Sequence, residues 1–142
     1  MGKMRVLAAI LSIVAADEAS AERTLAEGKA LFEQHCAICH GNDARGRGTA
    51  AHSLDTKPAD LTKIAARREG VWPMLEIMSI IDGYTKQFNP REQMPIIPEV
   101  TGGRKINFDT GNGIVTPAPV RLLALVEYLE AIQSPRPERY VP

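Results

Sequence analysis

The chain has 142 residues, of which 44% are apolar and 5% aromatic, and 17 Lys and Arg residues balance 17 Asp and Glu residues. This length fits one domain, and the composition is that of an ordinary soluble globule. The zero net charge argues against nucleic acid as a partner, because that binding depends on a basic surface. It also argues against strong whole-molecule steering, so we expect docking through local patches and a small, short-lived interface.

The first 21 residues have the pattern of a secretory signal peptide. A basic start precedes an apolar run at residues 6–16, and Ala19-Ser20-Ala21 is a small-residue cleavage site. The run has 11 residues, whereas a membrane span needs about 20, so an uncleaved anchor is the weaker alternative. We expect residues 1–21 to be a signal peptide, residues 22–142 to form the mature domain, and no stable membrane insertion.

Helical spacing of apolar residues predicts most of the mature fold. Thr24 and Glu27 fit a capping box at the start of the first helix, and Pro73 and Gly83 fit the first turn and the end of a later one. In chain order, helices are predicted over residues 25–36, within 59–69, over 73–82 and over 120–133. In the last of these, the spacing predicts inward-facing Leu122, Leu125, Val126, Leu129 and Ile132.

Long connections separate these helices. Residues 41–57 are glycine-rich and polar, and residues 84–100 carry three prolines, so both are predicted loops. Within residues 104–116, alternating Ile106 and Phe108 precede a turn-forming Asn112-Gly113 and the apolar pair Ile114-Val115, which predicts a small hairpin. Short helices with long loops bury little apolar surface relative to the entropy of ordering them, so a bulky apolar group is needed in the interior.

The stretch HCAICHG, residues 35–41, contains both cysteines and two of the three histidines. The spacing C-x-x-C-H is typical of c-type haem attachment, in which two cysteines form thioethers with the porphyrin and the adjacent histidine ligates iron. We therefore expect Cys36 and Cys39 to bind one haem c covalently and His40 to supply the proximal nitrogen.

A redox dithiol and half of a zinc site are the competing interpretations of Cys36 and Cys39. Zinc usually takes four protein ligands, and only His35 and His52 remain to supply them. A thioredoxin-like pair opens a helix after a strand, whereas these cysteines follow a predicted helix. The residues thus favour haem, with His35 and His52 as solvated or packing residues.

Met94 is the candidate for the second axial ligand. It lies in the proline-stiffened stretch QMPIIP, whereas Met74 and Met78 lie on an apolar helical stripe, where methionine usually packs. A thioether ligand favours ferrous iron and raises the reduction potential, and His/Met ligation leaves no iron position open to substrate. We therefore expect His40 and Met94 to be the iron ligands.

These motifs resemble those of class I c-type cytochromes, the single-haem cytochromes c of bacteria. Gly28, Phe32 and Cys36 have the spacing of the family's N-terminal pattern. The family's Leu-x-x-Tyr-Leu signature falls on residues 125–129, and Met94-Pro95 is similar to its axial-methionine loop. The resemblance covers residues 25–95 and 121–133.

The resemblance implies an all-α cytochrome c fold, in which three to four helices and long loops wrap around one covalently bound haem. In that fold Gly28 would let the first helix cross the last closely, with Phe32 and Tyr128 packed beside the crossing. The family's proline that supports the proximal histidine corresponds best to Pro58, where a carbonyl would accept the His40 ring N–H.

Two further features bear on the site. Residues 96–119 form an insertion that compact family members lack, with the predicted hairpin inside it, before the C-terminal helix. Trp72, Arg67 and Arg68 are candidates to hydrogen-bond or ion-pair the haem propionates, although an ordinary packed tryptophan and surface arginines fit them equally well.

The sequence therefore predicts an electron carrier, not an enzyme. We expect a soluble periplasmic monomer that shuttles one electron at a time between redox proteins. The alternative is an electron-transfer subunit or dedicated partner of a larger periplasmic dehydrogenase or reductase, with residues 96–119 as its docking element. A haem enzyme or gas sensor is a third hypothesis, and it requires an open or displaceable sixth iron position.

Overall fold

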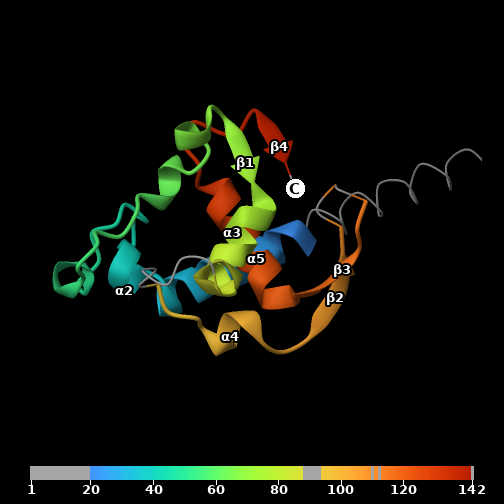
Figure 1. Ribbon diagram of the computed structural model, residues 1–142, viewed down its shortest axis with the longest axis horizontal. Coiled ribbons are helices and arrows are strands. Elements are labelled where there is room, and N and C mark those ends of the chain that lie inside the picture. Colours follow the sequence, from blue (N-terminus) through green and yellow to red (C-terminus); the bar gives the residue numbers. More distant parts are fainter. Residues whose placement is uncertain (1–19, 88–93, 110, 112, 142) are drawn as a thin grey trace, which may run out of the picture.

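Helices surround the interior of the protein, and long connections join them, as the computed structural model shows for residues 20–87, 94–109, 111 and 113–141 (Figure 1). The first helix covers residues 20–35. The later α-helices are α2 (Ala37–His40), α3 (Met74–Ile81), α4 (Pro98–Thr101) and α5 (Val120–Ala131). Single 3₁₀ turns occur at Ala51–Ser53, Leu61–Lys63, Ala66–Arg68 and Tyr84–Gln87. None of the helices among these residues is long and apolar enough to cross a membrane.

The first helix and α5 cross at Gly28, as the family resemblance implied. A Cβ atom at Gly28 would lie 2.0 Å from the Ala124 carbonyl oxygen and 2.8 Å from the Tyr128 Cβ. Beside this point the rings of Phe32 and Tyr128 pack with centroids 5.6 Å apart and planes tilted by 45°. Only glycine therefore permits this separation of the two helices.

Helix α5 supplies the largest share of the core. Its spacing predicted inward-facing Leu122, Leu125, Val126 and Leu129, and all four are buried, while Ile132, just after the helix, packs at the edge. The core also takes side chains from the first helix, α3 and α4, together with residues near α2. Its fully buried members include Trp72, Phe32, Leu122, Leu125, Val100 and Val126.

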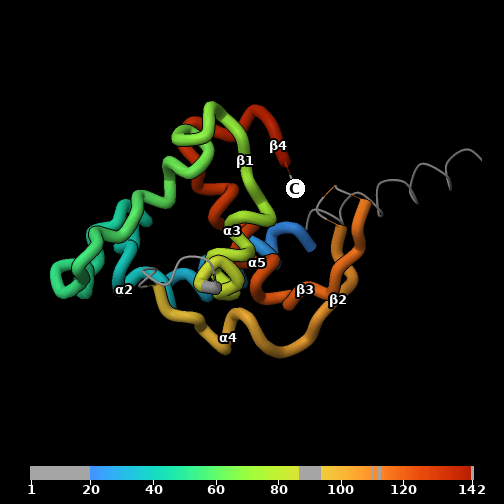
Figure 2. Tube along the Cα trace, in the orientation of Figure 1, coloured from blue at the N-terminus to red at the C-terminus, as the bar shows by residue number. Residues whose placement is uncertain are grey.

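Two small sheets complete the fold. Strand β2 (Lys105–Phe108) pairs antiparallel with β3 (Thr116–Pro119), with Lys105 opposite Pro119. Strand β1 (Val71–Pro73) pairs in parallel with β4 (Arg139–Val141), which brings the C-terminal tail beside the middle of the chain (Figure 2).

The helix-rich architecture agrees with the prediction, and several details differ. The first helix begins before the predicted capping box, so Thr24 lies inside it and donates to the Ser20 carbonyl (3.0 Å). The region 59–69 forms two 3₁₀ turns instead of an α-helix. In the hairpin, the second strand is Thr116–Pro119 instead of Ile114-Val115, which lie in the connection.

Two predictions lie largely or partly outside the described residues. The predicted signal peptide does so except for residues 20 and 21, which are helical. The predicted loop at 84–100 is interrupted at 88–93, and its end forms α4. The pairing of β1 with β4 was not predicted at all, because three-residue strands carry no periodic signal and their partners are separated by more than sixty positions in the chain.

Candidate functional site

The C-x-x-C-H motif forms one tight helical turn. The Cys36 N–H donates to the Phe32 carbonyl (2.8 Å), and the Cys36 carbonyl accepts from the N–H groups of Cys39 (3.1 Å) and His40 (2.9 Å). Cys36 therefore links the first helix to α2, and the three motif residues lie within about one turn. Cys36 is buried and Cys39 and His40 are half-buried.

Both cysteines are free thiols, as thioether formation requires. Burial, together with the charge of nearby Cys39, raises the pKa of Cys36 from 9.0 to about 11. An unattached Cys36 is therefore held as a neutral thiol, the form that suits an apolar environment.

The His40 ring is oriented by a backbone carbonyl. Its Nδ1 lies 3.0 Å from the Ala59 carbonyl oxygen, and since a carbonyl only accepts, Nδ1 must donate. In the neutral ring this leaves the lone pair on Nε2, which is the tautomer a metal ligand needs. Burial lowers the pKa of His40, and the hydrogen bond to Ala59 offsets part of that effect, so the neutral ring is favoured.

The acceptor for His40 is thus one residue beyond the predicted Pro58. The Pro58 carbonyl faces the neighbouring loop instead, where a Cβ atom at Gly46 would lie only 2.1 Å from its oxygen. Gly46 has a φ of +75°, which favours glycine, and its N–H donates to the His40 carbonyl (2.7 Å). The predicted segment was correct, but the predicted residue was wrong by one position. The close approach of Gly46 to Pro58 turns the Pro58 carbonyl away from the His40 ring and leaves the Ala59 carbonyl to accept from it.

Met94 belongs to the same interior as the motif. It is half-buried and packs against the hydrophobic cluster that includes Cys36, while the preceding residues 88–93 lie outside the described structure. Met78 is buried in this cluster and Met74 packs at its edge from α3, the packing role expected for both. The assignment of Met94 as iron ligand remains a prediction.

Trp72 has a buried donor with no partner. Its side chain is 1% exposed, and its Nε1 is the only buried side-chain polar atom without a hydrogen bond in the described part of the chain. An unsatisfied buried N–H costs about 1–3 kcal/mol, so such a donor points to a missing acceptor.

The two arginines proposed beside Trp72 are engaged within the protein. Arg68 forms a two-point ion pair with Glu76, and Arg67 Nη1 donates to the Asp60 carbonyl (2.8 Å). The free thiols, the orientation of His40 and the unpaired Trp72 donor together fit a covalently bound haem, with Trp72 as the residue left to meet a propionate oxygen.

Replacing Trp72 with phenylalanine separates this role from simple packing. If a propionate accepts from Nε1, we expect Trp72→Phe to change both the reduction potential and its dependence on pH, because the carboxylate loses a donor that favours its charged form. Potentiometry between pH 5 and 9 measures both. A variant with an unchanged potential at every pH, and equal or higher stability, would show that Nε1 has no such acceptor.

Gln133 is a buried polar residue that sequence reasoning missed. Its Oε1 accepts from the Ala65 N–H (3.0 Å), and its Nε2 donates to the carbonyls of Leu61 and Leu129 (both 2.7 Å). It thereby fixes the end of α5 against the segment that leads to Trp72. Its only sequence signal was a polar residue directly after the apolar stripe of α5, which a solvent-facing position explains equally well.

Comparison with known proteins finds one family model that is similar to part of the chain. Residues 23–85 match the family model described as cytochrome c oxidase, cbb3-type, subunit III, a c-type cytochrome domain. The matched residues include the C-x-x-C-H motif, Ala59, whose carbonyl accepts from the His40 ring, and Trp72. No curated protein and no solved structure matched the chain. Domains of this kind carry electrons by means of covalently bound haem c and are not enzymes, and residues 23–85 of this chain are similar to them.

Proposed function

We propose that this chain is an exported, periplasmic cytochrome c that binds one haem and shuttles single electrons between redox proteins. Bound haem iron supplies the chemistry, a reversible one-electron change. Cys36 and Cys39 hold the group covalently, His40 and Met94 ligate the metal, and Trp72 donates to a propionate. Export rests on the signal-peptide pattern of residues 1–21.

The orientation of His40 is the observation that carries this proposal. Its Nδ1 donates to Ala59 at 3.0 Å and its Nε2 keeps the lone pair, as a metal-ligating histidine with its outer hydrogen bond does. A ring fixed in this way needs little rearrangement when the charge on the metal changes. That rigidity favours electron transfer.

Absorption spectra of the mature protein, produced together with haem-attachment machinery, test the proposal. We expect a low-spin spectrum, a thioether-to-iron charge-transfer band in the oxidised form, and no change when carbon monoxide is added to the reduced form. Prompt carbon monoxide binding would mean an open sixth position and favour a sensor or enzyme. Absence of haem would return Cys36 and Cys39 to the dithiol and zinc interpretations.

A fixed subunit of a larger complex is the second candidate function. The matching family is named for an oxidase subunit, and the insertion at residues 96–119 lies outside the matched residues. Within this insertion, Ile106, Ile114 and Val115 are 40%, 66% and 59% exposed, as expected for a docking element. Co-purification of the chain with a membrane-bound complex at high salt distinguishes a subunit from a free carrier.

A further inference from the structure

The chain after α5, residues 133–141, lies along the segment that ends at Trp72. Its first residues bind the chain around the 3₁₀ turn Leu61–Lys63, and its last residues form β4, which pairs with β1. Figure 2 shows the red end of the chain beside the green stretch that contains β1. We call residues 133–141 the C-terminal strap.

The first anchor of the strap is at its beginning. Besides the hydrogen bonds of the buried Gln133, the Ser134 N–H donates to the Thr62 carbonyl (2.9 Å), and the Ser134 carbonyl accepts from Lys63 Nζ (2.6 Å). These bonds hold the chain shortly after the carbonyl that orients His40. The strap is therefore fixed to the same segment at which the candidate site is supported.

The second anchor is at the turn that precedes Trp72. The Gly70 carbonyl accepts from the N–H groups of both Glu138 (2.9 Å) and Arg139 (3.2 Å). From there β4 continues beside β1, with Tyr140 opposite Trp72. In the part of the chain that the structure describes, β4 is the only strand that pairs with β1. The backbone that carries Trp72 thus has its sheet partner in the strap.

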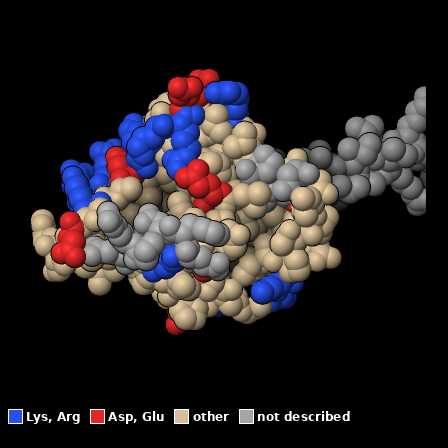
Figure 3. Space-filling view, viewed as in Figure 1, with Lys and Arg blue, Asp and Glu red and all other residues tan. Residues whose placement is uncertain are grey.

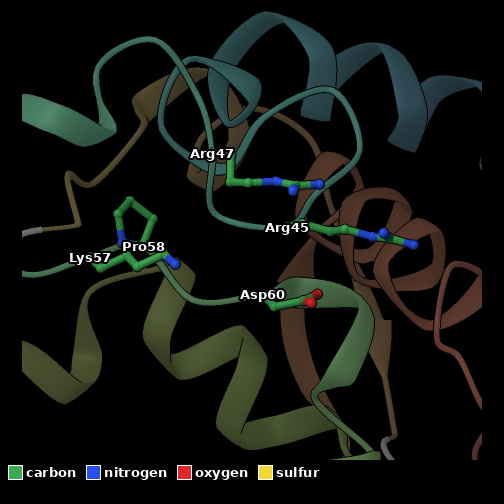
Figure 4. Close-up of a pocket in the computed structure, with 5 residues that line it drawn as sticks. All are labelled: Arg45, Arg47, Lys57, Pro58 and Asp60. Carbon is green, nitrogen blue, oxygen red and sulfur yellow. The ribbon is translucent and has the colours of Figure 1, made fainter.

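A pocket borders the start of the segment that the strap holds. It has a volume of about 410 Å³ and lies between the loop after α2 and residues 57–60 (Figure 4). Its lining residues are Arg45, Arg47, Lys57, Pro58 and Asp60. A backbone beside open space is restrained less than one in a packed core, so hydrogen bonds such as those to the strap have a larger share in fixing it.

The far end of the strap contributes hydrogen bonds and little burial. Residues 138–141 are all exposed, whereas Trp72 is 1% exposed. Figure 3 shows charged side chains of both signs over the end of the molecule where β1 and β4 lie in Figure 1. Detaching residues 138–141 should therefore leave the core folded and chiefly release the backbone of β1.

The Trp72 donor depends on where β1 places it. Its Nε1 is buried and has no partner among the described residues. A hydrogen bond weakens steeply when its angle falls below about 120° or its length exceeds about 3.2 Å. Trp72 lies in the middle of β1, and Pro73, which ends the strand, has no N–H to add a further bond. A shift of β1 would therefore carry the indole away from an acceptor on the haem.

We propose that the C-terminal strap positions Trp72 at the haem site, because its pairing with β1 holds Nε1 at the acceptor. The proposal rests on the proposed electron-carrier function and adds residues 138–141 to the groups that set the reduction potential. The strap acts through Trp72, whose N–H favours the charged form of a propionate. It is a positioning element and takes no part in ligation of the iron.

The double variant Glu138→Pro/Arg139→Pro tests the strap, and Glu138→Ala/Arg139→Ala is the matched control. Each removes one acidic and one basic side chain, so the net charge is unchanged. Only the proline variant loses the two N–H groups that donate to Gly70. A chain that ends at Pro137 lacks the same donors and is the second test variant. Circular dichroism measures whether each variant keeps its helices.

Hydrogen exchange of the Trp72 indole gives the first measurement. Trp72 is the only tryptophan in the chain, so its Nε1–H gives a single NMR signal in the reduced, haem-loaded protein. We expect this N–H to exchange about tenfold faster or more in the proline variant and in the shortened chain than in the wild type and the control. Equal exchange in all four proteins would overturn the proposal, since Trp72 would then be held without the strap.

Potentiometry between pH 5 and 9, in the wild type and in Trp72→Phe, gives the second measurement. We expect the proline variant to move the potential and its pH dependence toward those of Trp72→Phe, and to have no further effect when Trp72→Phe is already present. The control should match its own background in both cases. Since the strap acts through Trp72, the two changes are not additive.

Four outcomes would overturn the proposal alone. They are a proline variant with the wild-type potential at every pH, an equal shift in the Trp72→Phe background, an equal shift in the alanine control, and a Trp72→Phe protein with an unchanged potential. A wild-type protein without haem would contradict the proposed function and this proposal together.

Discussion

Replacing Met94 with alanine is expected to lower the reduction potential by on the order of 100 mV and to let carbon monoxide bind the reduced protein. The thioether favours ferrous iron, so its loss favours the oxidised state, and the vacated position becomes accessible. Met94 is half-buried against the cluster that contains Cys36, and it is followed by Pro95, which restricts its backbone. Potentiometry and a carbon monoxide difference spectrum measure the two effects.

Met74→Ala is the matched control for this experiment. Met74 is also half-buried at the edge of the same cluster, but it lies at the start of α3, where it packs. Its variant should lose some stability and keep both the wild-type potential and the resistance to carbon monoxide. If Met94→Ala retains the charge-transfer band, or if Met74→Ala loses it, the assignment of Met94 is wrong.

Gly28→Ala is expected to destabilise the protein by about 3 kcal/mol or more. At an open helical position this substitution would stabilise by about 1 kcal/mol, because alanine has the higher helix propensity. Here the new Cβ would lie 2.0 Å from the Ala124 carbonyl oxygen and 2.7 Å from its carbon, and both atoms belong to the backbone of α5. The helices must separate, which also disturbs the contact between Phe32 and Tyr128.

Denaturant unfolding of the haem-loaded protein measures this change. Lys29→Ala on the next residue is the control, because Lys29 is exposed and its ion pair with Glu33 (3.7 Å) lies on the surface. Such a pair contributes about 0.2–1 kcal/mol, so the control should unfold close to the wild type. If the Gly28→Ala protein is as stable as Lys29→Ala, the two helices can accommodate a Cβ atom at the crossing and the prediction is wrong.

The helices that line the core could be predicted well from the sequence, because each has a long apolar stripe. Helix α5 is the clearest case, since four of the five residues predicted to face inward are buried and the fifth, Ile132, is partly buried, although Leu123 and Ala124 are buried as well. The structure of residues 59–69 was harder to predict, and the predicted α-helix is two 3₁₀ turns. Its polar and apolar residues fit an α-helix, but the backbone there is fixed by partners remote in sequence, with Ala65 N–H bound to Gln133 and the Thr62 carbonyl bound to Ser134 N–H.

The candidate site divides in the same way. The motif Cys36-x-x-Cys39-His40 needs only local sequence, because one helical turn brings its three residues together. Three other features depend on which segments of the chain lie together, so they could not be predicted from local sequence patterns. They are the acceptor of the His40 ring N–H, the unpaired donor of Trp72 and the ion pair of Arg68 with Glu76.

The sequence by itself determined the attachment motif and the helices with strong apolar periodicity. These are features of neighbouring residues, and spacing along the chain is enough to specify them. Only the tertiary structure decided that Ala59 orients His40, that β4 pairs with β1 beside Trp72, and that Arg45 and Lys57 face one pocket. Each of these joins residues from different segments, and their meeting is set by packing of the whole core, which no local pattern records.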